Sequence, residues 1–172
     1  AHERFLILDL GGETYGLPLA AVDEVARFPK TLTRLPRAPD YVLGLMSLRG
    51  KVIPVVDQSR RFSIEQGGPG RARRIVVVTL GTLQAGFAVD AASRILEVKS
   101  SDLMPAPKLS DGGERLFDRV APLNGGGGGD VVLLMDPKAL LAHAEADLLR
   151  DLTAGSHARA TKAASRPKSH PS

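Results

Sequence analysis

Two charged residues stand out from apolar surroundings in this chain of 172 residues. Glu24 lies between Val22 and Val25, and Arg49 occupies a short turn between the apolar runs 43–48 and 52–56. A guanidinium group pairs with carboxylates and carbonyl oxygens while its aliphatic stem packs on apolar groups, so an arginine in such a turn can anchor a protein interface. The alternative is a solvated turn residue. The spacing alone leaves both interpretations open.

The other polar residues form no recognisable catalytic or metal-binding motif. The chain has no cysteine, which excludes disulfides, thiolate nucleophiles and iron–sulfur clusters, and its four histidines lack zinc-ligand spacing. The glycine run 125–129 precedes a strand and no Gly-Lys-Ser/Thr follows it, so it predicts a hairpin loop rather than a phosphate loop. Asp57, Asp90 and Asp136 each end an apolar run, where we expect them to cap the following turn. The sequence therefore predicts a protein that is not an enzyme, with no cofactor and no metal.

The formal charge of +4 comes entirely from the end of the chain. Residues 153–172 hold four basic residues and no acid, which leaves 19 basic and 19 acidic residues in the rest. This tail is poor in large apolar residues and is predicted to be a disordered basic segment. A neutral body argues against a broad nucleic-acid-binding face. No apolar run reaches membrane-spanning length and no secretory signal is visible, so we expect a cytoplasmic protein.

The apolar pattern is that of a mainly β fold. Period-2 and short apolar runs predict strands, and glycine-containing turns predict hairpins between them. The expected strands are 5–10, 15–19, 43–48, 52–56, 74–80, 83–89, 95–98, 117–123 and 131–135. One helix is predicted after Asp136, an N-cap followed by Pro137, with apolar residues at 140, 141, 144, 148 and 152. Residues 20–25 and 57–62 are expected to form only a turn or two of helix.

The chain also repeats the pattern of its first half in its second half. Residues 5–8 correspond to 75–78, Gly16 to Gly86, and Val25 to Ile95. Each half holds two hairpins, and the second hairpin ends in an aspartate before a predicted helix. We therefore expect one domain over residues 1–152, built as a first β barrel (about 1–72) and a second (about 73–152), with the tail 153–172 outside it.

Here the sequence resembles a known family. Residues 35–57, LPRAPDYVLGLMSLRGKVIPVVD, are similar to the signature of the CheW-like domain, the family of coupling proteins in bacterial chemosensory arrays. The similarity continues over residues 5–25, 86–90, 95–98 and 103–107, and spans roughly 4–150. Ser47, Gln58 and Ser63 depart from the residues usual in the family.

The resemblance implies a fold of two five-stranded SH3-like β barrels and no enzymatic activity. It implies that the chain bridges the cytoplasmic tip of a chemoreceptor to the regulatory domain of a CheA-type histidine kinase. The receptor helices would lie near a groove between the barrels, and barrel ends would dock on the kinase. Arg49 matches the family's signature arginine, and Glu24 matches an acidic position thought to pair with it.

The leading hypothesis is therefore a cytoplasmic adaptor recruited to membrane-associated receptor arrays. Its contact area is expected from apolar residues around the Arg49 turn and at the barrel ends, which gives the candidate binding residues Glu24, Leu45, Arg49, Gly50, Val52, Val89 and Ile95. One alternative is the CheW-like part of a longer CheA- or CheV-type protein, since the chain begins with Ala1 rather than methionine. A more remote alternative is a small barrel that binds nucleic acid.

Overall fold

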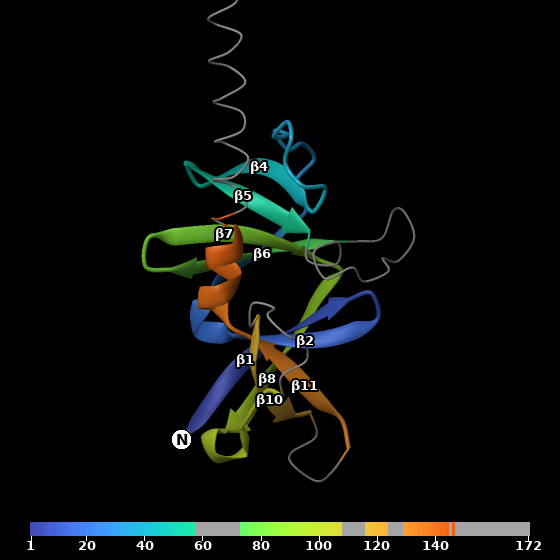
Figure 1. Cartoon of the computed structure of the whole chain (residues 1–172), viewed down its shortest axis with the longest axis vertical. Helices are drawn as coiled ribbons and strands as arrows, with labels where there is room; N and C mark the ends of the chain where they lie inside the picture. The colour runs from blue at the N-terminus through green and yellow to red at the C-terminus, as the bar shows by residue number, and fades with distance from the viewer. Residues whose placement is uncertain (58–72, 108–115, 124–128, 145, 147–172) are drawn as a thin grey trace, which may run out of the picture.

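The computed structural model describes residues 1–57, 73–107, 116–123, 129–144 and 146, and over these it is a mainly β protein with two sheets and a C-terminal helix (Figure 1). Sheet A has the order β8-β1-β2-β11-β10-β9. Its strands are β1 (His2–Leu10), β2 (Glu13–Pro18), β8 (Ala91–Lys99), β9 (Met104–Pro105), β10 (Phe117–Pro122) and β11 (Val131–Met135). Sheet B has the order β3-β6-β7-β5-β4. Its strands are β3 (Val22–Arg27), β4 (Val42–Leu48), β5 (Lys51–Asp57), β6 (Arg74–Leu80) and β7 (Leu83–Val89). The predicted mainly β fold of two β subdomains is confirmed. Sheet A has six strands rather than the expected five, because the two-residue strand β9 pairs with β10.

The two sheets exchange their first hairpins. The β1–β2 hairpin, from the first half of the chain, lies in sheet A with β8 to β11, whereas β6–β7, from the second half, lies in sheet B with β3 to β5. A parallel pairing completes each exchange, between β11 and β2 and between β5 and β7. The predicted boundary near residue 72 therefore does not separate the two barrels. A hairpin can be predicted from adjacent residues, but the sheet that it joins depends on its pairing with strands far away in the sequence.

Three hydrophobic clusters explain this exchange. One cluster lies inside the barrel formed by sheet A, and a second lies inside the barrel formed by sheet B. The third, which we call the inter-barrel core, contains residues from both sheets and the helix. Successive side chains of β1 point alternately into the sheet A cluster and the inter-barrel core, and those of β6 point alternately into the sheet B cluster and the inter-barrel core. The side chains involved are Phe5 and Ile7 inside sheet A, Ile75 and Val77 inside sheet B, and Leu6, Leu8, Val76 and Val78 in the inter-barrel core. Both strands are buried on both faces, which is why their sequences are continuous apolar runs.

The strand register follows the repeat seen in the sequence. Leu6 pairs with Ile95 between β1 and β8, and Val76 pairs with Val25 between β6 and β3. Leu6 is the repeat counterpart of Val76, and Val25 is that of Ile95, so the two pairings are equivalent. Both also contain a register shift, after Ile7 on β1 in the first and after Val22 on β3 in the second. The two halves therefore use one pairing scheme twice.

The helix begins as predicted. The carboxylate of Asp136 accepts a hydrogen bond from the backbone N–H of Lys138 at 3.0 Å, which is N-cap geometry, and Pro137 is the first helical residue. Leu140, Leu141 and Ala144 are buried in the inter-barrel core. The predicted contacts of residues 148 and 152 lie outside the described residues.

Two further sequence expectations are changed by the structure. The short helical turn expected over residues 20–25 is limited to the 3-10 turn η1 (Leu19–Ala21), and strand β3 begins at Val22. Its alternating half-buried and exposed residues are those of an edge strand with two different faces. Asp90 caps a turn, but one from the other half: its carboxylate accepts from the N–H of Gly11 at 2.7 Å. Residues 58–62 of the second expected turn lie outside the described residues.

A charged cluster spans sheet A from β1 to β10. Arg119 donates to both carboxylate oxygens of Glu3, at 3.0 and 3.3 Å, and its guanidinium lies 5.6 Å from the centre of the Phe5 ring. Beside it, the Oδ1 atom of Asp118 is buried without a hydrogen-bond partner among the residues that the structure describes. Burial raises the pKa of the Asp118 carboxyl, Arg119 opposes the rise, and the carboxylates of Asp136 and Glu3 add to it.

The close packing of Gly16 gives a stability prediction. A Cβ atom on this residue would lie 2.6 Å from Cδ2 of Leu134 inside sheet A. We expect Gly16→Ala to lower the free energy of unfolding by about 1–3 kcal/mol through overpacking. In a Leu134→Ala background the same change should cost much less, because the space is then free. Urea denaturation of the two single variants and the double variant measures this coupling, and simple additivity would contradict the steric explanation.

The half-buried carboxyl of Asp118 gives a prediction about pH. Its raised pKa means that the folded state holds the proton more tightly than the unfolded chain, so ionised Asp118 destabilises the fold as pH rises above the ordinary pKa of the group. We expect Asp118→Asn to be more stable than the wild type at about pH 7.5, and this advantage should shrink as pH is lowered towards about 4. Urea unfolding across this range tests it, with the exposed Asp130→Asn as control. An advantage that does not change with pH would rule out the titration of Asp118 as its cause.

Candidate functional site

The turn between β4 and β5 holds an arginine in an unfavourable backbone conformation. Leu48 pairs with Lys51, so Arg49 and Gly50 form a two-residue hairpin turn, and their φ angles are +51° and +81°. Positive φ at both central positions defines a type I′ turn, which prefers asparagine, aspartate or glycine. Gly50 fits this preference. A side chain in the left-handed region costs about 1–2 kcal/mol, so Arg49 is not the residue that the turn alone favours.

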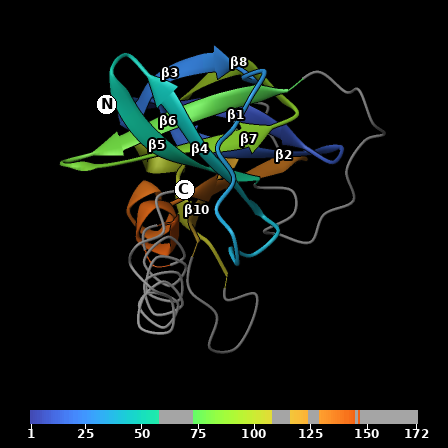
Figure 2. The same ribbon diagram turned by 90° about the horizontal axis from the view of Figure 1, so that it is seen from above.

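Arg49 is bonded to the other candidate charge. Its Nε donates to Oε1 of Glu24 at 2.7 Å, and the exposed fractions of the two side chains are 76% and 24%. Glu24 lies on β3 and Arg49 follows β4, and these two strands are the opposite edges of sheet B. The ion pair therefore closes the seam of this barrel, and Figure 2 shows the β4–β5 turn approaching β3. The register shift between Val22 and Glu24 is a bulge of the kind that re-aims a side chain.

The other edge contact of β4 is made by the backbone of Thr33. Its N–H donates to the carbonyl of Leu45 at 2.9 Å, and its carbonyl accepts from the N–H of Leu45 at 2.8 Å. Leu45 is half-buried at this point. Gly44, beside it, has a φ of +143°, and a Cβ there would collide with the backbone of Thr33. The hairpin that carries Arg49 is thus bonded to neighbouring segments at two points, to Thr33 at Leu45 and to Glu24 at its turn.

The structure brings most of the predicted site residues together. Glu24, Arg49 and Gly50 meet at the seam, and Val52 on β5 is 67% exposed close to the turn. Ile95 is also exposed, at 55%, but it lies on β8 in sheet A. Val89 was expected to offer contact area, and this expectation is wrong: it is buried in the inter-barrel core at the end of β7. An apolar residue at the end of a strand does not reveal from sequence which face it takes.

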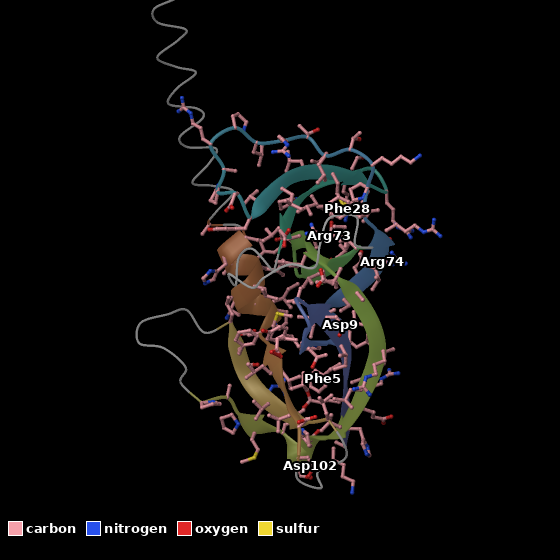
Figure 3. All side chains as sticks on the ribbon, turned by 90° about the vertical axis from the view of Figure 1, so that its right-hand side faces the viewer. Phe5, Asp9, Phe28, Arg73, Arg74 and Asp102 are labelled. Atoms are coloured by element: carbon pink, nitrogen blue, oxygen red, sulfur yellow. The ribbon has the colours of Figure 1, made fainter. Side chains whose placement is uncertain are left out.

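Among the described residues, sequence reasoning missed four exposed apolar residues, of which Leu80 lies at the end of β6. Val25 on β3 is 41% exposed and is the repeat counterpart of Ile95, so the predicted repeat could have identified it. Met104 and Val131 are 61% and 60% exposed and line a pocket of about 570 Å³ at the far end of sheet A. Pro105, Val120 and Pro122 add apolar walls to this pocket. Asp102, which also lines it, lies at the opposite end of the molecule from Phe28 and Arg73 in Figure 3.

The site combines exposed apolar side chains with one ion pair. Exposed apolar side chains beside a fixed ion pair are typical of sites that bind another protein. In the described ranges, no three His, Asp or Glu side chains gather closely enough to hold a metal ion. No helix of the described part has the length and apolar character to cross a membrane.

The exposed pair at the seam gives a prediction about stability. We expect Arg49→Asn to change the free energy of unfolding by less than about 1 kcal/mol, because an exposed ion pair contributes little and asparagine tolerates positive φ. Arg49→Ala loses the pair without that tolerance and should be less stable than the asparagine variant. Thermal unfolding of both variants measures this order. A loss of stability in Arg49→Asn well beyond that of an ordinary surface substitution would instead make the pair a structural requirement.

Comparisons with known proteins agree with this arrangement. The family model of the CheW-like domain matches residues 4–145. The chemotaxis protein CheW of Rhizobium meliloti is 36% identical over 110 residues, covering 64% of this chain and 70% of that protein. The chemotaxis protein CheW of Klebsiella aerogenes is 28% identical over 155 residues and 90% of each chain. The crystal structure of the scaffolding protein TtCheW from Thermoanaerobacter tengcongensis is similar with a TM-score of 0.68 and 26% identity, covering 79% of this chain and 85% of that one. The two-barrel chain with its Arg49–Glu24 pair therefore belongs to the CheW-like domain family.

Proposed function

We propose that this protein is a non-enzymatic adaptor that couples a chemoreceptor to a CheA-type histidine kinase. The observation that carries this proposal is the match of the CheW-like domain to residues 4–145, within which the Arg49–Glu24 pair is formed. The names of the similar proteins, chemotaxis protein CheW and scaffolding protein TtCheW, support a role in chemotaxis signalling. The protein would act where receptors gather at the membrane.

The distribution of exposed apolar residues suits an adaptor with several contacts. Val25 and Ile95 lie on β3 and β8, the strands that pair with the two exchanged hairpins. Val52 lies on sheet B near the Arg49 turn, and the pocket beside Met104 lies at the far end of sheet A. We assign the receptor to the region between the barrels on the side of Val25, and the kinase regulatory domain to the barrel ends. Separate surfaces allow both partners to bind at once.

The ion pair would act by holding the hairpin rather than by supplying much binding energy. Arg49 is largely exposed, so its pair with Glu24 contributes little to folding, but it fixes the β4–β5 turn against β3. A turn that is fixed before binding loses less entropy when a partner docks on it. Loss of the pair should therefore weaken coupling while the fold is kept.

A reconstituted signalling assay tests this role. Receptor-containing membranes, the kinase from the same genome and this chain are mixed, and receptor-dependent phosphorylation is measured. We expect Arg49→Asn to need roughly ten times more adaptor for the same kinase activity, which corresponds to about 1.4 kcal/mol. Lys51→Asn, an exposed lysine in the same hairpin, is the matched control and should behave as wild type.

A charge swap between positions 24 and 49 distinguishes two roles of Arg49, positioning the hairpin and contacting the partner directly. If the pair only positions the hairpin, the double variant Glu24→Arg with Arg49→Glu should recover part of the coupling that each single variant loses. No recovery would assign Arg49 to direct contact with the partner. Wild-type kinase control in Arg49→Asn would remove the ion pair from the proposed mechanism altogether.

A further inference from the structure

Two arginines face each other across neighbouring strands of sheet B. Arg27, the last residue of β3, is the register partner of Arg74, the first residue of β6, and both side chains are exposed. Like charges placed directly opposite each other on a sheet are destabilising. Among the residues that the structure describes, neither arginine has a carboxylate partner. The one hydrogen bond given by Arg74 goes from its Nη1 to the carbonyl of Arg73 at 3.1 Å.

The repeat shows that this register position does not require two arginines. Arg4 on β1 corresponds to Arg74 on β6, and its register partner on β8 is Glu97. The position that holds Arg27 in one half therefore holds an acid in the other, and only one half has opposite charges. The like-charged pair is a local departure from the arrangement that favours folding, and such departures are expected at functional positions.

Of the three arginines in this region, only Arg27 and Arg74 are available to bind a partner. Arg73, next in sequence to Arg74, is already engaged: it donates to the buried carboxylate of Asp57 at 3.1 Å, and its guanidinium lies 5.8 Å from the centre of the Phe28 ring. In Figure 3, Arg73, Arg74 and Phe28 lie in the same region of the molecule, where β3 ends and β6 begins. On β3, the exposed Val25 shares a face with Arg27, two positions away. Within the described residues, this surface thus combines two arginines that lack a carboxylate partner with one exposed apolar side chain.

We infer that Arg27 and Arg74 recognise a pair of carboxylates on an acidic helix of the chemoreceptor, a step that rests on the proposed adaptor function. Side chains directly opposite on antiparallel strands have Cβ atoms about 4.5–5.5 Å apart. Residues three or four apart on a helix are about 5–6 Å apart, so two acids at this spacing match the two guanidinium groups. An apolar residue beside them would cover Val25. The pair thereby selects receptors by charge.

A protein helix fits this surface better than a lipid headgroup does. Surfaces that bind anionic membranes gather many basic residues, whereas here an apolar residue borders the arginine pair and Arg73 is already paired. Guanidinium groups bind carboxylates with two hydrogen bonds each, which gives a geometric preference as well as attraction. Vesicles containing anionic phospholipid serve as the competing probe in the test.

The test uses the full chain and the purified cytoplasmic signalling fragment of a chemoreceptor from the same genome. Affinity is measured by calorimetry at low and moderate salt, and the melting temperature is measured in parallel. We expect Arg27→Glu to weaken binding at least tenfold and to flatten its salt dependence. The same change should raise the melting temperature, because a glutamate at position 27 would face Arg74 as Glu97 faces Arg4.

Arg4→Glu is the matched control, because it makes the same change in net charge at the corresponding pair of the other half. It should leave the affinity within about twofold and lower the melting temperature, because two glutamates would then face each other. The opposite effects of Arg27→Glu on binding and stability exclude partial unfolding as the cause of weaker binding.

Three results would overturn the inference. They are unchanged binding by Arg27→Glu at low salt, an equal loss of binding in Arg4→Glu, and a loss of binding to anionic vesicles while the receptor fragment is still bound normally. A wild-type chain that does not bind the receptor fragment at all would instead remove the proposed adaptor function, and the inference with it.

Discussion

The double-sided burial of β1 and β6 is the constraint on which the rest of the structure depends. Each strand places one set of side chains inside its own barrel and the other set in the inter-barrel core. Neither strand can satisfy both faces within a single barrel, so each hairpin lies at the boundary between the two. The exchange of hairpins follows from this requirement, and it makes the two barrels one folding unit. Their relative position is then set by close-packed apolar contacts rather than by a flexible linker.

The residues that stabilise the fold are buried, whereas the residues proposed to bind partners are exposed. The three hydrophobic clusters supply the burial that holds the fold. The charged features, by contrast, lie on strand edges and turns, where Arg49 keeps a strained φ angle and Arg27 faces Arg74. Both features are unfavourable for folding, and the fold tolerates them because the neighbouring strands are paired. Surface residues can therefore change with the partner without loss of the fold.

Local features of this structure could be predicted from the sequence, and long-range ones could not. The apolar runs predicted the strands, and Asp136 with Pro137 predicted the start of the helix, because hydrophobic period and capping act over a few residues. The sequence repeat also agrees with the equivalent registers of β1 with β8 and of β6 with β3. The predicted barrel boundary near residue 72 was wrong because the sequence of a hairpin does not indicate which sheet it joins. The predicted exposure of Val89 was wrong for a related reason, since both faces of its strand are apolar.

The same reasoning explains why the seam pair was recognised more easily than the arginine pair. Arg49 interrupts an apolar pattern, so its residue type alone marks it, and Glu24 is marked in the same way. Arg27 and Arg74 are far apart in the chain, in charged and unremarkable surroundings, and only the strand register places them together. Their meaning also depends on a comparison with Arg4 and Glu97, which requires the register of both halves. In a duplicated fold, each half can be compared with the other. Where corresponding positions differ in charge, the fold does not require either residue, and binding to a partner can account for the difference.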